Sequence, residues 1–338
     1  MVTLQKDIQL YRTNAQQITW KVPAFFCNDW AAVRLLQICS QLSERPAFDI
    51  VYGSPRCAWS GGRPSAINQT LEEEQLIEYV RTYKELGAIC AFTLSRLNVP
   101  KADYADPYCN QILDIIEEYE GEAIIYDDGL AHYVRSTHPK IKTVASLNKA
   151  MCDFKDSFSG HKDETAYYFD LLEDYDIVVI RCEFASDDEK LEALSDVKDR
   201  IEIIVNQFCT PNCMHVYKHL EAIEEWNNGD QRSFCQPCFH LDTLSVMENR
   251  LRLNLFMSDS RISELAGLGF KRMKLAGRNS ILPKFLDMVS HYIFEPTGAI
   301  SIIGNQIIRE FRLISTGTNL NIQQYQLPDP EAIRLVAG

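Results

Sequence analysis

Short apolar runs rich in β-branched residues alternate along this chain with longer segments in which apolar residues recur every three or four positions. The first pattern is typical of buried strands and the second of amphipathic helices. The expected strands are Phe48–Gly53, Ile89–Leu94, Ala123–Tyr126, Lys142–Ala145, Ile177–Arg181, Ile201–Asn206, Leu253–Phe256 and Arg272–Leu275. Several runs are apolar at every position, which suits parallel strands covered on both faces. The alternation therefore predicts an α/β fold, a TIM-type eight-stranded parallel barrel.

The segments between the expected strands carry helix signals. Thr70 and Glu73 have the spacing of a capping box, and Gly87 follows the last apolar position of that segment. We divide the chain into an N-terminal extension packing on the barrel (1–46), the barrel itself (47–295) and an accessory C-terminal segment (296–338). From Ser301 on, the pattern alternates loosely, which predicts a short accessory β segment.

The composition is that of an ordinary globular protein: 338 residues, 46% hydrophobic and 24% charged. The net charge of −13 argues against an extended nucleic-acid surface, because phosphate binding needs a positive field, although it allows a local basic pocket. We expect no membrane association and a cytoplasmic location, because no apolar stretch approaches the ~20 residues that span a bilayer and the N-terminus lacks a signal peptide's apolar core. The 11 cysteines are an odd number and several lie in apolar segments, so most are expected to be buried reduced thiols.

Polar residues follow almost every expected strand, and in a TIM-type barrel the site lies at the carboxyl ends of the strands. Ser95 and Ser146 belong to this group. The candidate catalytic residues are Arg63, Asp127, Asn148, Arg181, Glu183, Asn206, Lys274 and Arg278. Of these, we expect Arg63, Asp127, Asn148, Glu183, Asn206 and Lys274 to converge on one mouth of the barrel. The alternative is that the residues are loop caps and that the cations pair with Asp127, Asp128 and Glu183 in a structural ion network.

Four cysteines form the sharpest local pattern. Two lie in the pentapeptide that starts at Cys209, and after an interval of 21 residues two more follow in Cys-Gln-Pro-Cys; the candidate ligands are Cys209, Cys213, Cys235 and Cys238. Two pairs of thiols suit either a four-coordinate Zn or an iron–sulfur cluster. Thr210 is a plausible N-cap and Pro211 a plausible first helical residue, and a helix N-terminus favours thiolates. The alternative is two pairs of reduced thiols in loops. His215, His219 or His240 could replace one thiol as ligand.

Other motifs are missing from the sequence. It has no Walker-type loop, no Gly-x-Gly-x-x-Gly after the first strand, no His-Glu-x-x-His and no Gly-x-Ser-x-Gly elbow. Nucleotide-cofactor and classical hydrolase functions therefore lose their usual support.

The chain resembles the collagenase-like peptidase family, unassigned peptidase family thirty-two. The resemblance rests on the segments 51–53, 61–63 and 92–95, on 124–127, 145–148 and 204–206, and on the closing 269–278, whose Gly-(variable)-Lys-(apolar)-x-Gly-Arg pattern is the most specific. It covers roughly residues 48 to 295. It implies a TIM-type barrel and, in several members, a four-Cys iron–sulfur cluster. Members include proteins for oxygen-independent hydroxylation in ubiquinone synthesis and for hydroxylation of tRNA wobble uridine.

Three functions compete at this point. The first is an enzyme with a 4Fe-4S cluster that modifies an anionic organic, peptide or RNA-linked substrate by hydroxylation or redox chemistry. In it, Arg63, Arg181, Lys274 and Arg278 anchor anionic groups, and an electron donor or a related protein is a possible partner. The second is a peptidase acting on a peptide substrate, for which no nucleophile and base stand out by position. The third is a non-catalytic partner subunit with structural Zn.

Overall fold

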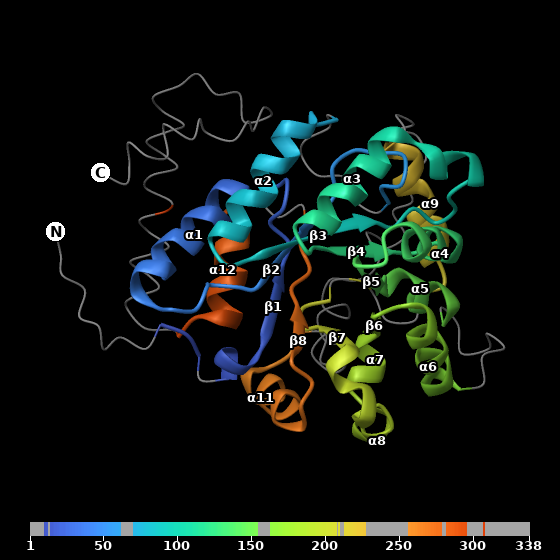
Figure 1. The fold of residues 1–338 in the computed structure, drawn as a ribbon. Helices are drawn as coiled ribbons and strands as arrows, with labels where there is room; N and C mark the ends of the chain where they lie inside the picture. Colours follow the sequence, from blue (N-terminus) through green and yellow to red (C-terminus); the bar gives the residue numbers. More distant parts are fainter. Residues whose placement is uncertain are drawn as a thin grey trace.

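Eight parallel strands close into a barrel in chain order, and β1 pairs with β8 (Figure 1). The strands are β1 (Thr19–Val22), β2 (Ile50–Gly53), β3 (Ile89–Leu94), β4 (Glu122–Ile125), β5 (Lys142–Ala145), β6 (Ile177–Ile180), β7 (Ile201–Ile204) and β8 (Arg272–Lys274). The computed structural model describes residues 10–12, 14–61, 70–154, 163–207, 209, 213–227, 256–278, 282–295 and 307. The predicted TIM-type α/β barrel is therefore confirmed.

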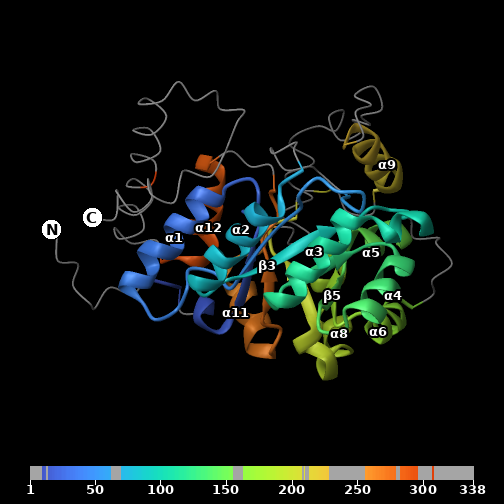
Figure 2. The ribbon, with the colours of Figure 1, turned by 45° about the horizontal axis from the view of Figure 1, so that its top comes forward.

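Helices follow the strands and surround the barrel (Figure 1). They are α1 (Asp29–Leu42), α2 (Glu73–Glu85), α3 (Pro107–Glu118), α4 (Asp128–Thr137), α5 (Leu147–Asp153), α6 (Glu164–Asp174), α7 (Cys182–Ala185), α8 (Asp188–Glu192), α9 (Val216–Asn227), α11 (Asp259–Leu268) and α12 (Leu282–Ile293). The described part of the chain also has three short 3-10 helices: η1 (Asn14–Gln17), η2 (Lys101–Ala105) and η3 (Ser195–Arg200). Figure 2 shows α9 outside the ring formed by the other helices. No helix in the described part of the chain is both long and apolar enough to cross a membrane.

One of the eight expected strands is wrong as a barrel strand. β7 pairs directly with β8, as in Ile203 opposite Met273, and leaves no place between them for Leu253–Phe256. Phe256 forms only an isolated antiparallel bridge with Asn206, and residues 251–255 lie outside the described part. The missing strand is β1, which lies in the segment expected to be an N-terminal extension. Pattern reasoning missed it because Lys21 interrupts a run of only four residues.

Two helix details also bear on the sequence analysis. The expected capping box at Thr70 and Glu73 is displaced, because α2 begins after Glu72, whose backbone N–H donates to the side chain of Gln75 at 3.0 Å. Gly87 does end this helical segment, and its φ of 84° is one that residues with a Cβ rarely adopt. The accessory C-terminal segment, apart from Ile307, lies outside the described residues.

The strands bury both faces, as their apolar runs require. Alternate positions point outward and pack with the helices in one cluster, for example Val51, Phe92 and Val178. The positions between them form a second cluster, which includes Ile124 and Val179 and fills the inside of the barrel. The barrel is thus a packed core and not a pore.

Charged side chains complete the barrel interior. Lys21 Nζ lies 2.6 Å from Glu122 Oε2 and 2.5 Å from Glu202 Oε2, and all three side chains are about 1% exposed. Arg272 contacts Glu122 at 2.5 Å, and Lys274 Nζ lies 3.5 Å from Glu202 Oε1. Three cations therefore face two carboxylates. Lys274 lies at the carboxyl end of the barrel, because it is the last residue of β8.

Candidate functional site

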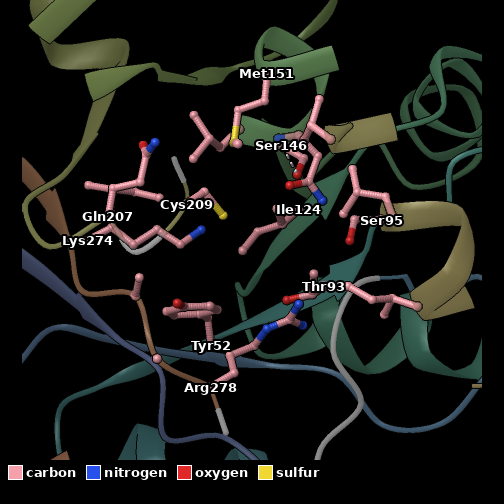
Figure 3. A pocket seen from close by; sticks show the side chains of 18 of the residues that line it. Tyr52, Thr93, Ser95, Ile124, Ser146, Met151, Gln207, Cys209, Lys274 and Arg278 are labelled. Carbon is pink, nitrogen blue, oxygen red and sulfur yellow. Dashed lines mark hydrogen bonds between the residues drawn. The ribbon is translucent and has the colours of Figure 1, made fainter. Parts of the chain in front are cut away.

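A cavity of about 210 Å³ opens at the carboxyl end of the barrel (Figure 3). Its floor comes from the inward-facing ends of the strands, including Tyr52, Ile124 and Ile204. Residues from α5 and α9 form its side and cover. The cavity therefore lies where active sites of this barrel type are found.

Two cations reach into the cavity. Figure 3 shows the Lys274 amino group and the Arg278 guanidinium directed into the space between Tyr52, Thr93 and Cys209. Lys274 Nζ lies 4.4 Å from the centre of the Tyr52 ring. Burial lowers the pKa of Lys274 to about 8; Glu202 opposes this change, and the charges of Lys21 and Arg278 add to it. With this pKa, both the ammonium and the amine form of Lys274 are present near physiological pH.

Buried polar atoms in the cavity wall lack hydrogen-bond partners. Within the described part of the chain, Thr93 Oγ1, Ser95 Oγ and Gln207 Oε1 have none. Their residues are 5%, 2% and 3% exposed. A buried polar group without a partner costs about 1–3 kcal/mol, so this wall is suited to a ligand that supplies the missing hydrogen bonds.

Helix α9 covers one side of the cavity. Val216 packs with Met151 and Cys152 of α5, and Leu220 joins this apolar cluster. Glu224 of α9 accepts a hydrogen bond from the backbone N–H of Leu97, the third residue after β3, at 2.5 Å. Burial raises the pKa of Glu224 to about 7. The helix is thus fixed to the barrel by an apolar contact and one carboxylate.

Glycines allow close backbone contacts beside the cavity. A Cβ on Gly61 would lie 2.0 Å from the carbonyl oxygen of Ser95, and one on Gly53 would lie 2.0 Å from that of Phe25. Gly61 therefore lets the loop after β2 rest directly on the cavity wall at Ser95. Both glycines lie in segments that carry the family resemblance.

Five of the residues singled out as catalytic or metal-binding line the cavity: Asn148, Cys209, His219, Lys274 and Arg278. Ser95 and Ser146, singled out as polar residues after strands, line it as well. Asn148 lies in the first turn of α5, where its backbone N–H donates to the N-cap Ser146. Arg63, Cys235 and Cys238 lie outside the described residues.

The other candidates hold the structure together around the cavity. Asp127 is the N-cap of α4 and accepts the N–H of Leu130 at 2.7 Å. The Asn206 side chain accepts the N–H of Ala276 at 2.6 Å and donates to its carbonyl at 3.1 Å, which joins the ends of β7 and β8. Neither residue is among those that line the cavity.

Arg181 and Glu183 form an ion network with a third residue. Arg181 donates two parallel hydrogen bonds to Glu164, at 2.8 and 2.9 Å, and lies 3.7 Å from Glu183. These carboxylates raise the pKa of Arg181 against the effect of burial. For Arg181, the structure thus shows the ion pairing that we considered as an alternative, although Glu164 is its main partner. The six residues expected at one mouth all follow or end strands, but of the five that are described only Asn148 and Lys274 reach the cavity.

Two of the four predicted metal ligands are described. Cys209 is exposed at the cavity wall, and Cys213 precedes α9, which begins at Val216. Among the described residues there is no group of three or more His, Cys, Asp or Glu side chains that could hold a metal. Two thiols do not complete a four-ligand site, so the cluster stays a prediction.

Sequence reasoning missed Tyr52, Thr93 and Gln207. Tyr52 and Thr93 lie inside strands, and only the two-residue alternation of β2 and β3 shows that they point into the barrel. Gln207 follows Asn206 by one residue, so its place after a strand could have indicated it.

Comparisons with known proteins add a likeness to solved structures. No protein-family model and no curated protein matches the chain. Among solved structures, the U32 peptidase Mk0906 is similar over 82% of this chain and 97% of its own, with a TM-score of 0.44 and 14% identity. A likeness of this extent says nothing of the activity of this chain. The fold and the site themselves define a TIM-type barrel protein with a cavity at its carboxyl mouth.

Proposed function

We propose that this protein is an enzyme whose substrate is a small anionic organic molecule bound in the mouth cavity. Lys274 and Arg278 bind its carboxylate or phosphate group. The observation that carries the proposal is the charge of the cavity lining, which among the described residues has two cations, Lys274 and Arg278, and no carboxylate. In a protein with net charge −13, such a local excess is a specific feature.

The remaining cavity groups suit such a substrate. The hydroxyls of Thr93 and Ser95 donate hydrogen bonds to substrate oxygens, which gives these buried groups the partners that they lack. Ile124 and Ile204 contact the carbon skeleton. A volume of about 210 Å³ is below the ~300–1,000 Å³ of pockets for drug-sized ligands, which favours a small molecule.

Lys274 has two roles in this proposal. Its lowered pKa makes it able to accept or donate a proton near pH 8. An anion bound beside it favours the ammonium form and raises its pKa again. Lys274 therefore holds the substrate as a cation and is a candidate for proton transfer in the cavity.

The predicted four-cysteine centre is a separate part of the proposal. Cys209 lines the cavity and Cys213 lies just before the helix that covers it. Thiolates of this kind suit an iron–sulfur cluster, with Zn as the alternative. A metal centre held by Cys209, Cys213, Cys235 and Cys238 would adjoin the substrate and supply electrons or Lewis acidity for a hydroxylation or redox reaction.

Calorimetric titration with inorganic phosphate and with malonate tests the anion site. Lys274→Met and Arg278→Gln are each expected to weaken binding about 10- to 100-fold, because hydrogen bonds to charged groups contribute about 1.5–3 kcal/mol. Lys271→Met is the matched control, since it removes the same charge at the other end of β8, where the side chain is exposed. Binding to the wild type should weaken above pH 8, as Lys274 loses its charge. No binding by the wild type, or equal losses in all three variants, would contradict the proposal.

Anaerobic purification with analysis of iron, zinc and acid-labile sulfide tests the metal centre. Substituting any one of the four cysteines by Ser is expected to abolish bound metal. Full metal content in the quadruple Ser variant would refute the centre. Peptide cleavage that survives removal of the cysteines would instead support the peptidase function, and zinc without anion binding would support a non-catalytic partner subunit.

A further inference from the structure

The polar groups of the mouth cavity are divided between two opposite walls. Thr93 lies in β3 and Ser95 directly after it, whereas Gln207 lies three residues after β7. The strands follow one another around a closed ring, so β3 and β7 are four strands apart in either direction. Figure 3 shows Gln207 with Lys274 on one side of the cavity and Thr93 with Ser95 on the other. A ligand that contacts all of these groups therefore spans the cavity.

Gln207 needs a different partner from the groups on the opposite wall. The residue is 3% exposed, and its Oε1 atom has no hydrogen-bond partner in the described part of the chain. A carboxamide oxygen only accepts hydrogen bonds, whereas the hydroxyls of Thr93 and Ser95 can also donate them. A fully ionised carboxylate or phosphate brings no donor, so on its own it leaves this oxygen unpaired. The missing partner is an N–H or O–H group of the ligand.

Gln207 lies beside the groups that bind the anion. Strands β7 and β8 are neighbours: Ile204 pairs with Lys274, and the backbone N–H of Val205 donates to the Lys274 carbonyl at 3.1 Å. Adjacent strands are only about 4.8 Å apart. The donor of the ligand therefore belongs close to its anionic group, whereas Thr93 and Ser95 face its far end.

The charge of the lining distinguishes between the two kinds of donor. Among the described residues, two cations and no carboxylate line the cavity. Glu202 lies 3.5 Å from Lys274 Nζ but is not part of the lining. The cations repel a protonated amine, while a hydroxyl is a neutral donor and meets no such repulsion. The lining thus favours an alcohol over an amine.

We propose that the substrate of this site is a small hydroxy acid. Its carboxylate or phosphate group lies on Lys274 and Arg278, its hydroxyl donates to Gln207 Oε1, and a second oxygen-bearing group reaches Thr93 and Ser95. This assignment rests on the anion site proposed above and narrows its ligand. Malate carries these three groups on a short carbon chain. Succinate lacks only the hydroxyl, and aspartate has an ammonium group in its place, so the three acids separate the donor from the anion.

Calorimetric titration of the full-length protein with malate, succinate and aspartate tests the proposal. Malate is expected to bind about tenfold more tightly than succinate, because its hydroxyl gives the buried oxygen a hydrogen bond. Aspartate is expected to bind at least about tenfold more weakly than malate, because the two cations repel its ammonium group. Glycerol phosphate and propyl phosphate are the corresponding pair for a phosphate ligand, and the pair with the larger preference identifies the acidic group.

Substitution of Gln207 tests the assignment of the hydroxyl. Gln207→Leu removes the acceptor at nearly the same volume, so it should reduce the affinity for malate to that for succinate. Gln17→Leu is the matched control, because Gln17 is exposed and precedes β1 at the opposite end of the barrel. This control should keep the preference for malate. If Gln207→Leu does not fold, as judged by circular dichroism, Gln207→Met replaces it.

The outcomes separate this inference from the anion site itself. If phosphate, malonate and succinate all fail to bind, the anion site is wrong and the inference fails with it. The inference alone is overturned if these anions bind but the hydroxyl gives no preference in either pair of ligands. It is also overturned if aspartate binds as tightly as malate, or if Gln207→Leu retains the preference for malate.

Discussion

Replacing Lys21 by Met is expected to destabilise the barrel more strongly than any exposed charge substitution of the same kind. Lys21 is the shared partner of Glu122 and Glu202, at 2.6 and 2.5 Å. Without it, Glu122 keeps Arg272, and Glu202 keeps only contacts of 3.5 Å to Lys274 and 3.8 Å to Arg272. Removing one partner of a buried ion pair costs about 3–5 kcal/mol. Met fills nearly the same volume, so the loss comes from the uncompensated carboxylate.

That loss is a large share of the ~5–15 kcal/mol by which domains are stable. Urea unfolding followed by the fluorescence of Trp20, which neighbours Lys21 and is 1% exposed, measures it. The control is Lys84→Met, because Lys84 and Glu120 lie 2.5 Å apart but are 40% and 80% exposed. Water screens the exposed pair, so its loss should have little effect. The double variant Lys21→Met/Glu202→Gln should recover part of the stability.

The pH dependence gives a second readout of the same network. Burial opposes the ionisation of Glu202, but Lys21, Lys274 and Arg272 outweigh it and lower its pKa from 4.5 to about 2. A lowered folded-state pKa contributes stability above pH 4.5 that is lost as the pH falls toward 2. The Lys21→Met variant should lose this contribution at a higher pH. Equal destabilisation by Lys21→Met and Lys84→Met, with identical acid profiles, would refute the reasoning.

Further predictions concern a buried carboxylate and two glycines. Burial raises the pKa of Asp29 from 3.8 to about 7, against the hydrogen bond from Tyr83, so the wild type should lose up to about 4 kcal/mol as the pH rises through this range. Asp29→Asn should remove that slope in urea titrations, and an unchanged slope would contradict it. Gly61→Ala should cost about 1–3 kcal/mol and weaken phosphate binding, because its Cβ would lie 2.0 Å from the Ser95 carbonyl oxygen. Gly267→Ala, whose Cβ meets nothing within 4 Å, should instead stabilise the protein by about 0.5–1 kcal/mol in the same assay.

The fold could be predicted from sequence where strands are apolar on both faces, as in Ile177–Ile180. It could not be predicted at β1, where the inward position is Lys21. Its partners Glu122 and Glu202 are distant in sequence, and only the closed barrel shows that the three charges share one interior. Conversely, Leu253–Phe256 has the composition of a strand, but a short apolar run does not reveal which strand it pairs with.

The location of the site could be predicted from the sequence, but only some of the residues that form it could. Strand ends meet at one mouth in any parallel barrel, so Asn148, Lys274 and Arg278 could be placed there from order alone. Arg181 has the same position after a strand, yet it pairs with Glu164 of α6, and spacing along the chain does not show that pairing. Thr93 contributes to the cavity as a strand residue, so a search limited to the residues after strands overlooks it.

Closure of the barrel through β1 and β8 has a consequence during protein synthesis. The pairing of Thr19 with Arg272 and of Lys21 with Lys274 joins segments made at opposite stages of translation. Strands β1 to β7 can pair in order as they leave the ribosome, but both outer strands keep unpaired N–H and C=O groups until residues 272–274 emerge. Open edges of this kind template aggregation. The nascent chain therefore passes through a long stage in which both outer strands are open to pairing with other chains.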